Sequence, residues 1–205
     1  MRYIFKIILL ILSTAVLQLG SCVKKDNNIY FIDKIFAKYV DFPVGSWWVY
    51  KDTMSGEVDS VKMIYNLRSM VTSKTLAKYE KLATQYIFFN KTATDTIIGN
   101  TYQHAPPKHI YNETITKYGI QGFPRLYYPF TIGNNSSVQG GPSITKIDSL
   151  VSFGGINYRN VVTVFYSSSA NGNSLESVKY AEGVGVIYRK FFNGKTSILI
   201  NYRIK

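Results

Sequence analysis

The chain has 205 residues, with 24 basic and 12 acidic side chains and a formal net charge of +12. Hydrophobic residues make up 46% of it and aromatic residues 15%, which is enough for one domain with a sizeable apolar core. Its single cysteine excludes an intrachain disulfide, and the absence of any Lys/Arg run longer than two argues against a nucleic-acid-binding patch.

Residues 1–21 have the three-part layout of a secretory signal peptide. Arg2 and Lys6 give a basic start, residues 7–17 are uncharged and mostly apolar, and the small residues Gly20 and Ser21 come last. The apolar run is shorter than the roughly 20 residues that a transmembrane helix needs. We therefore predict cleavage after Ser21, which would remove two basic groups and leave 184 residues with a formal charge of +10.

The only cysteine, Cys22, ends the run Leu19-Gly20-Ser21-Cys22. This run resembles the lipobox of bacterial lipoproteins. The resemblance implies that Cys22 becomes the mature N-terminus and carries a diacylglycerol on its sulfur, which attaches the chain to a membrane. Val23 stands where an Asp retains enterobacterial lipoproteins at the inner membrane, so the resemblance implies the outer membrane. Lys24-Lys25-Asp26 matches a surface-export signal only in part, which leaves the membrane face open. An ordinary signal peptide and an uncleaved anchor are the alternatives.

Residues 22–29 are short and polar and are predicted to be a lipidated tether, followed by a single domain over residues 30–205. A weak helical spacing predicts one short helix between residues 30 and 39. From Phe42 onward the pattern is that of strands. The predicted strands are residues 46–51, 58–67, 80–89, 95–98, 110–117, 125–130, 144–153, 156–166, 177–181, 186–192 and 195–203. The sequence thus predicts an all-β, mainly antiparallel domain of about ten strands, built as a curved sheet or half-barrel, or as a sandwich.

Three hairpins are predicted in the last third of the chain. Gly154-Gly155 and Asn193-Gly194 are two-residue hairpin signals, and a Ser-rich loop with Asn171-Gly172 precedes residues 177–181. The last strand is expected to alternate between the two faces of the sheet. This alternation places Ile198, Ile200 and Tyr202 on one face and Leu199, Asn201 and Arg203 on the other.

Two motifs carry a further resemblance. Residues 42–52 contain Gly-Ser-Trp-Trp-Val-Tyr, and residues 180–189 contain Gly-Val-Gly. Together they resemble the opening and closing strands of Bacteroidota cell-envelope lipoproteins, many of them uncharacterised. The resemblance implies an antiparallel β-domain on a lipid tether, and it implies no established reaction or ligand.

The residues of these motifs also have structural interpretations. Trp47 and Trp48 face opposite sides of a strand, which predicts one in the core and the other at a rim. Since paired tryptophans also form sugar-stacking platforms, both are candidate ligand-facing aromatics. Gly183 and Gly185, two residues apart, are expected on one strand face and indicate a bulge or a close backbone crossing.

Residues able to carry catalysis are few. His104 and His109 flank a Pro-Pro loop and have no evident further ligands, so no metal site is predicted. Ser143 and Lys146 match the Ser-x-x-Lys of penicillin-recognising enzymes, but the companion motifs are missing and the residues lead into a strand. We therefore predict no catalytic residue and no cofactor, and we do not expect an enzyme.

Four Asp-Ser/Thr-apolar triplets resemble the O-glycosylation site of Bacteroidota exported proteins. The resemblance implies four acceptors: Thr53, Ser60, Thr96 and Ser149. The same triplet also arises wherever a turn aspartate adjoins a strand.

Three functional hypotheses remain. In the first, the domain is a non-catalytic module at the outer membrane that binds an apolar or glycan ligand. In the second, it is a structural or accessory subunit of an outer-membrane assembly. An envelope hydrolase is the least favoured. The expected partners are the membrane, through the anchor, and anionic envelope glycans or an outer-membrane protein, because the chain is basic. No nucleic acid is expected.

Overall fold

The computed structural model describes residues 29–72, 77–89, 94–104, 108–115, 125–128, 130–133, 143–166 and 175–205. These contain one helix, α2 (Lys34–Val40), and twelve strands. The strands are β1 (Ile29–Tyr30), β2 (Trp47–Asp52), β3 (Val58–Thr72), β4 (Lys78–Phe89), β5 (Thr94–His104), β6 (Lys108–Ile115), β7 (Arg125–Tyr128), β8 (Ser143–Phe153), β9 (Ile156–Phe165), β10 (Leu175–Ala181), β11 (Gly185–Phe191) and β12 (Thr196–Arg203). The predicted all-β fold is confirmed.

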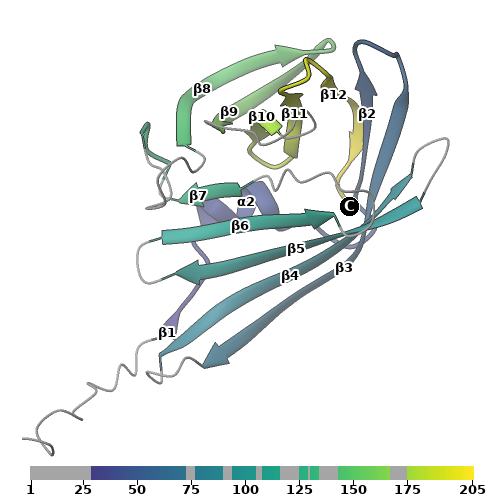
Figure 1. The fold of residues 1–205 in the computed structure, drawn as a ribbon. Helices are drawn as coiled ribbons and strands as arrows, with labels where there is room; N and C mark the ends of the chain where they lie inside the picture. Colours follow the sequence, from purple (N-terminus) through teal and green to yellow (C-terminus); the bar gives the residue numbers. More distant parts are fainter. Residues whose placement is uncertain are drawn as a thin grey trace, which may run out of the picture.

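The described strands form one sheet in the order β7-β6-β5-β4-β3-β2-β12-β11-β10-β9-β8, antiparallel throughout, with β1 added parallel to β4. Figure 1 shows this sheet curled into a half-barrel, with β3–β6 below and β8–β12 rolled over above. Because β2 pairs with β12, the two ends of the domain meet in the middle of the sheet. The structure is thus the curved sheet of the prediction and not the sandwich.

Each predicted strand has a counterpart. Strands β3 and β5 end well beyond their predicted ends at residues 67 and 98, the other bounds agree within about two residues, and the two-residue strand β1 was not predicted. The Gly154-Gly155 hairpin joins β8 to β9, and Asn193-Gly194 lies between β11 and β12. The helix begins later than the spacing suggested because Asp33 caps it. The Asp33 carboxylate accepts hydrogen bonds from the backbone N–H groups of Ile35 (2.7 Å) and Phe36 (3.3 Å).

The expected alternation of the last strand is wrong beyond Leu199. Leu199 lies opposite Tyr50 and Tyr202 lies opposite Trp48, with a register shift between Leu199 and Asn201. Directly opposed residues share a face of the sheet, so Leu199 and Tyr202 face the same side. A β-bulge that inserts one extra residue, here Ile200, reverses the alternation after it.

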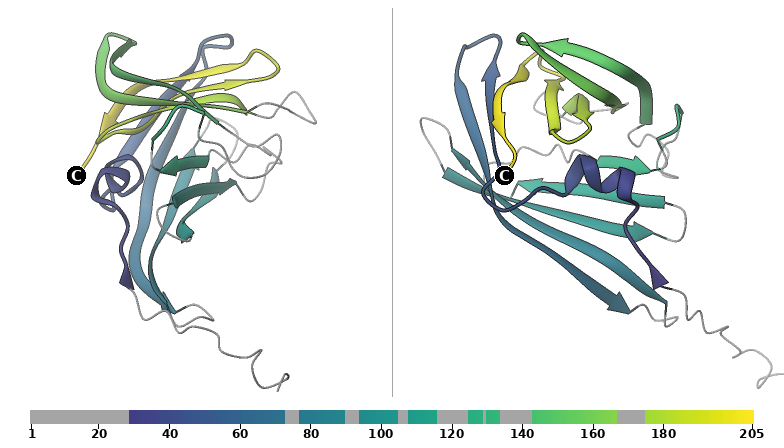
Figure 2. Two further views of the ribbon diagram at one scale, coloured as in Figure 1. Left: turned by 90° about the vertical axis from the view of Figure 1, so that its left-hand side faces the viewer. Right: turned by 180° about the vertical axis from the view of Figure 1, so that it is seen from behind.

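The helix lies between the two halves of the curled sheet (Figures 1 and 2). On one side the Tyr39 hydroxyl donates a hydrogen bond to the Asn160 carbonyl of β9 (2.7 Å). On the other side, the Ile32 N–H just before the helix donates to the Glu80 carboxylate of β4 (2.8 Å). Phe36, Tyr39 and Val40 are buried, so α2 fills space that the half-barrel leaves open.

Candidate functional site: an aromatic pocket inside the half-barrel

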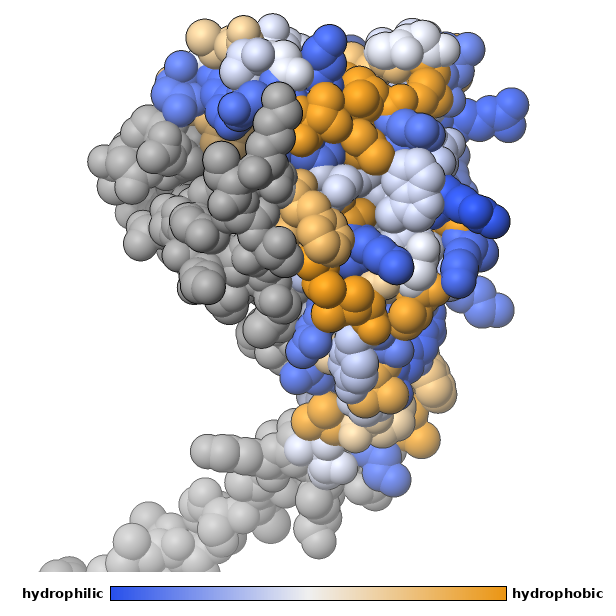
Figure 3. Space-filling model, turned by 90° about the vertical axis from the view of Figure 1, so that its right-hand side faces the viewer, coloured by the Kyte–Doolittle hydropathy of each residue, from blue (hydrophilic) through white to orange (hydrophobic). Residues whose placement is uncertain are grey.

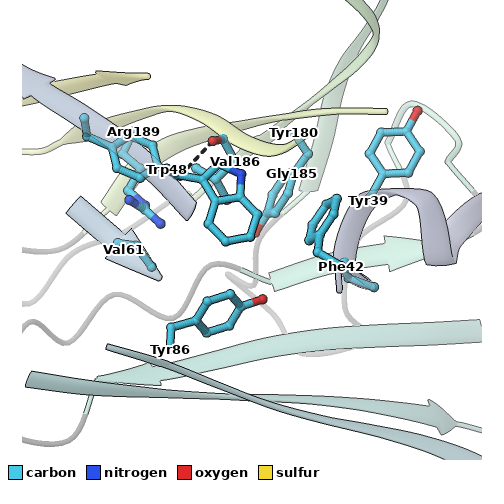
Figure 4. A pocket seen from close by; sticks show the side chains of 11 residues that line it. Tyr39, Phe42, Trp48, Val61, Tyr86, Tyr180, Gly185, Val186 and Arg189 are labelled. Atoms are coloured by element: carbon cyan, nitrogen blue, oxygen red, sulfur yellow. Dashed lines mark hydrogen bonds between the residues drawn. The ribbon is translucent and has the colours of Figure 1, made fainter. Parts of the chain in front are cut away.

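A small pocket lies on the concave side of the sheet, where α2, β2, β3, β4, β10 and β11 converge (Figure 4). We call it the aromatic pocket. Its lining residues are Tyr39, Val40, Phe42, Trp48, Tyr50, Val61, Tyr86, Tyr180, Gly185, Val186 and Arg189. The free space inside is about 30 Å³, which is room for one or two water molecules.

The alternation of β2 builds one wall of the pocket. Trp48 and Tyr50 face inward and are 3% and 4% exposed. The Trp48 indole N–H donates to the Val184 carbonyl (2.6 Å), and the Tyr50 hydroxyl donates to the Val186 carbonyl (2.9 Å). Both polar groups are therefore used by the backbone around the start of β11, and the rings present apolar surface to the pocket.

The two tryptophans lie on opposite faces, as predicted. Trp47 is half-buried on the other side of the sheet, opposite Lys62 of β3 and Arg203 of β12. Of the two candidate ligand-facing aromatics, only Trp48 lines the aromatic pocket. The two indoles do not form a single stacking platform.

Aromatic side chains from distant parts of the sequence complete the wall. The Trp48 ring meets Phe42 at 5.3 Å between centroids and Tyr86 at 5.9 Å, both edge to face. The Arg189 guanidinium lies over the Tyr50 ring, 4.8 Å from its centroid. The pocket therefore combines an apolar lining with one cationic side chain.

Gly185 is required by this packing. Its backbone has φ +89°, and a Cβ placed there would lie 3.0 Å from Cε2 of Phe42. The Gly-Val-Gly motif predicted a bulge or a close backbone crossing, whereas the group that approaches Gly185 most closely is the Phe42 side chain. Gly183 lies in the turn before β11 and not on a strand face, and its N–H donates to the Lys38 carbonyl (2.8 Å).

A charged cluster lies beside the pocket at the β2–β3 hairpin. Asp59 is directly opposite Tyr50, and burial raises the pKa of its carboxyl. Burial also acts to raise the pKa of Asp52, but hydrogen bonds from Met54, Lys195 and Ser55 outweigh it, so that pKa is lowered. Lys195 lies 3.1 Å from the Asp52 carboxylate. The Lys195 ion pair and the turn hydrogen bonds from Met54 and Ser55 account for the Asp52 carboxylate.

The predicted anchor lies outside the described residues, as do Ser21 and the loop with Asn171-Gly172. His104 and His109 lie on neighbouring strands but are not opposed, since His109 is opposite Gln103. No group of three or more His, Cys, Asp or Glu that could hold a metal is present among the described residues.

The four candidate glycosylation acceptors occupy different settings. Thr53 is exposed in the turn after β2 and Ser149 is exposed on β8, whereas Ser60 is half-buried on β3 and Thr96 belongs to β5. The turn interpretation holds for the first triplet. The Asp52 carboxylate accepts hydrogen bonds from the N–H groups of Met54 (2.8 Å) and Ser55 (3.4 Å).

Sequence reasoning found Trp48 but missed Tyr86 and Arg189. Tyr86 lies opposite Met63 on the inner face of β4, and Arg189 reaches the pocket from β11. Tyr86 belongs to no motif, and Arg189 ends the motif of residues 180–189 without any sign that it faces a pocket. The available signal was the period-2 alternation of each strand, and it identifies pocket residues only when the strand order is known.

No helix in the described part of the chain is long and apolar enough to cross a membrane. Comparison with known proteins gave no matching family model, no matching curated protein and no matching solved structure. The geometry of the aromatic pocket is therefore the basis of the functional argument.

Proposed function

We propose that this chain is a lipid-anchored outer-membrane protein, held through Cys22, whose half-barrel is a non-catalytic module that binds an apolar ligand. The observation that supports the binding role is the aromatic pocket on the concave side of the sheet. Concave apolar sites with few polar groups are the usual form of small-molecule sites.

An apolar ligand fits this pocket better than a glycan. Sugars need hydrogen-bond donors and acceptors that converge on them. The Trp48 indole N–H and the Tyr50 hydroxyl already donate to backbone carbonyls. The remaining contacts they offer are the edges and faces of their rings, which suit a hydrocarbon.

The size of the pocket limits what enters it. A free space of about 30 Å³ accepts the end of a chain, and a larger group must displace side chains. Arg189 is the cationic side chain of the lining, and its charge also favours the ionised form of the Asp59 carboxyl. A ligand with an apolar chain and an anionic head, such as a fatty acid or a lipid phosphate, would compete with Asp59 for this charge.

Binding of a fluorescent fatty acid to the purified chain tests this role. Val61 lines the pocket and lies opposite Trp48, so Val61→Phe should fill the free space and weaken binding at least tenfold. Val58→Phe is the matched control, because Val58 is 43% exposed on the same strand and lies opposite Lys51 on the other face. Equal affinity of the folded Val61→Phe and Val58→Phe chains would refute the pocket as the binding site.

The anchor needs its own test. In cells fed labelled palmitate, the native chain should incorporate label, and Cys22→Ser should abolish both incorporation and leader cleavage. Continued lipidation of the Cys22→Ser chain would contradict the proposal. The intact mass of the native protein also reports sugar on Thr53, Ser60, Thr96 or Ser149.

One observation favours the accessory-subunit alternative. Among the described strands β8 is an edge of eleven residues, paired only with β9, and it exposes Ile147 (42%) and Leu150 (58%). Such an edge is able to accept a strand from a partner protein. If this is its role, Leu150→Lys should remove a polypeptide that co-purifies from native membranes and leave fatty-acid binding unchanged.

A further inference from the structure

Exposed apolar side chains gather at the end of the molecule where the described chain begins. Ile29 and Phe31 are 52% and 64% exposed, and Met70 and Val71 of β3 are 46% and 45% exposed. We call these four residues the apolar tip. Strand β1 and the end of β3 lie at the bottom of Figure 1.

The apolar tip is held in place by the sheet. The register puts Tyr30, Tyr79 and Val71 in one row across β1, β4 and β3. The rings of Tyr30 and Tyr79 stack with centroids 5.4 Å apart. The segment that leads into the domain is thus fixed against the β3–β4 hairpin, and its exposed side chains belong to one continuous end.

Exposed lysines lie near the apolar tip. Lys78 is exposed at the start of β4, and Lys34 is exposed at the start of α2. Arg68 pairs with the carboxylates of both Asp41 and Glu80, which leaves these three groups with a formal charge of −1. Figure 3 shows apolar and hydrophilic side chains side by side at this lower end. Apolar groups beside lysines are typical of surfaces that lie in a bilayer interface.

The chain length brings this end close to the anchor. Six residues separate Ile29 from Cys22, and they include Lys24 and Lys25. The seven Cα-to-Cα steps from Cys22 to Ile29 span at most about 25 Å. A lipid on Cys22 therefore keeps the apolar tip near the membrane surface.

We propose that the apolar tip rests on the bilayer that holds the anchor, with its four apolar side chains at the boundary between head groups and acyl chains. This inference rests on the proposed lipid on Cys22. The inference also orients the domain. The end of β3 and the start of β4 lie next to the membrane, and the β2–β3 turn with Met54 points away from it (Figure 1).

The test uses the lipoprotein purified from membranes and reconstituted in vesicles of phosphatidylethanolamine and phosphatidylglycerol. Single cysteines replace Phe31 or Met70 and carry an environment-sensitive fluorophore, while the lipid blocks Cys22. Met54→Cys and Leu150→Cys are the controls, because these side chains are also apolar and are 72% and 58% exposed. Two tip positions are labelled so that the experiment can still be read if one of the two variants folds poorly.

Fluorophores at residues 31 and 70 should shift to the blue and be quenched by nitroxide-bearing lipids, whereas those at residues 54 and 150 should do neither. Equal quenching at tip and control positions would overturn the tip contact and leave the anchor intact. Labelling of Cys22 in the unsubstituted chain would instead show that the anchor is absent, and the inference would fall with it.

Discussion

Replacing Gly185 with alanine tests the packing that forms the aromatic pocket. The new Cβ would lie 3.0 Å from Cε2 and 3.2 Å from Cζ of Phe42. Phe42 is 5% exposed and packs edge to face on Trp48, so its ring has little room to retreat. The backbone at Gly185, with φ +89°, is also unfavourable for a residue with a side chain.

The positive φ and the contact with Phe42 each add to the loss in the free energy of unfolding. The positive φ costs about 1–2 kcal/mol, and overpacking of a well-filled core costs about 1–3 kcal/mol more. Gly183→Ala is the matched control, because Gly183 has φ +73° but no atom within 4 Å of the added Cβ. We therefore expect Gly185→Ala to lower the free energy of unfolding by about 2–5 kcal/mol, and Gly183→Ala by about 1–2 kcal/mol.

Urea unfolding followed by tryptophan fluorescence measures both values. Phe42→Leu removes the ring that the new methyl group meets, so in that background the two glycine substitutions should cost nearly the same. If Gly185→Ala and Gly183→Ala differ by less than about 0.5 kcal/mol in the native background, the steric argument is refuted.

Further predictions concern the hydrogen bonds of α2 and the dependence of stability on pH. Tyr39→Phe removes the donor to the Asn160 carbonyl (2.7 Å) and should cost about 1–2 kcal/mol in urea unfolding; no loss would mean that water satisfies that carbonyl equally well. Burial raises the pKa of Tyr39, and likewise of Tyr158, from 10.0 to about 12. The raised pKa stabilises the fold below pH 10, and this stabilisation is lost as the pH rises towards about 12. The free energy of unfolding should therefore fall between these two pH values. The fall should be less steep for Tyr39→Phe, which lacks the titrating hydroxyl. Hydrogen bonds from Lys38 and Asn160 lower the pKa of Glu182 below its ordinary 4.5. That stabilisation is present above 4.5 and is lost as the pH falls through the lowered value, so Glu182→Gln should flatten the acid side of the stability profile; an unchanged slope would contradict the assignment.

The sequence predicted what local patterns determine. The alternation in β2 separated buried Trp48 from half-buried Trp47, and Asn193-Gly194 marked a real hairpin. The alternation predicted for β12 is wrong after Ile200. Nothing in the neighbouring residues indicates the β-bulge there, which reverses the faces on which the following side chains lie. Asp33 marked the helix start more accurately than the apolar spacing did.

The aromatic pocket depends on pairings that no local pattern contains. Phe42 meets Gly185 only because β2 lies beside β12, and β12 beside β11, in the middle of the sheet. The Gly-Val-Gly motif predicted a bulge or a close backbone crossing, whereas the group near Gly185 is an aromatic ring. Strand order is a tertiary property, so Tyr86 and Arg189 became visible as pocket residues only in three dimensions.

The most direct test of the account is the mass of the protein released from its own membranes, measured under native and then denaturing conditions. The denatured mass should equal residues 22–205 plus a covalent diacylglyceryl group and, where the amine is also acylated, one further acyl chain. The native mass should exceed the denatured mass by an apolar ligand that Val61→Phe fails to retain. A denatured mass of unmodified polypeptide would contradict the anchor. A native mass equal to the denatured one would contradict the binding role.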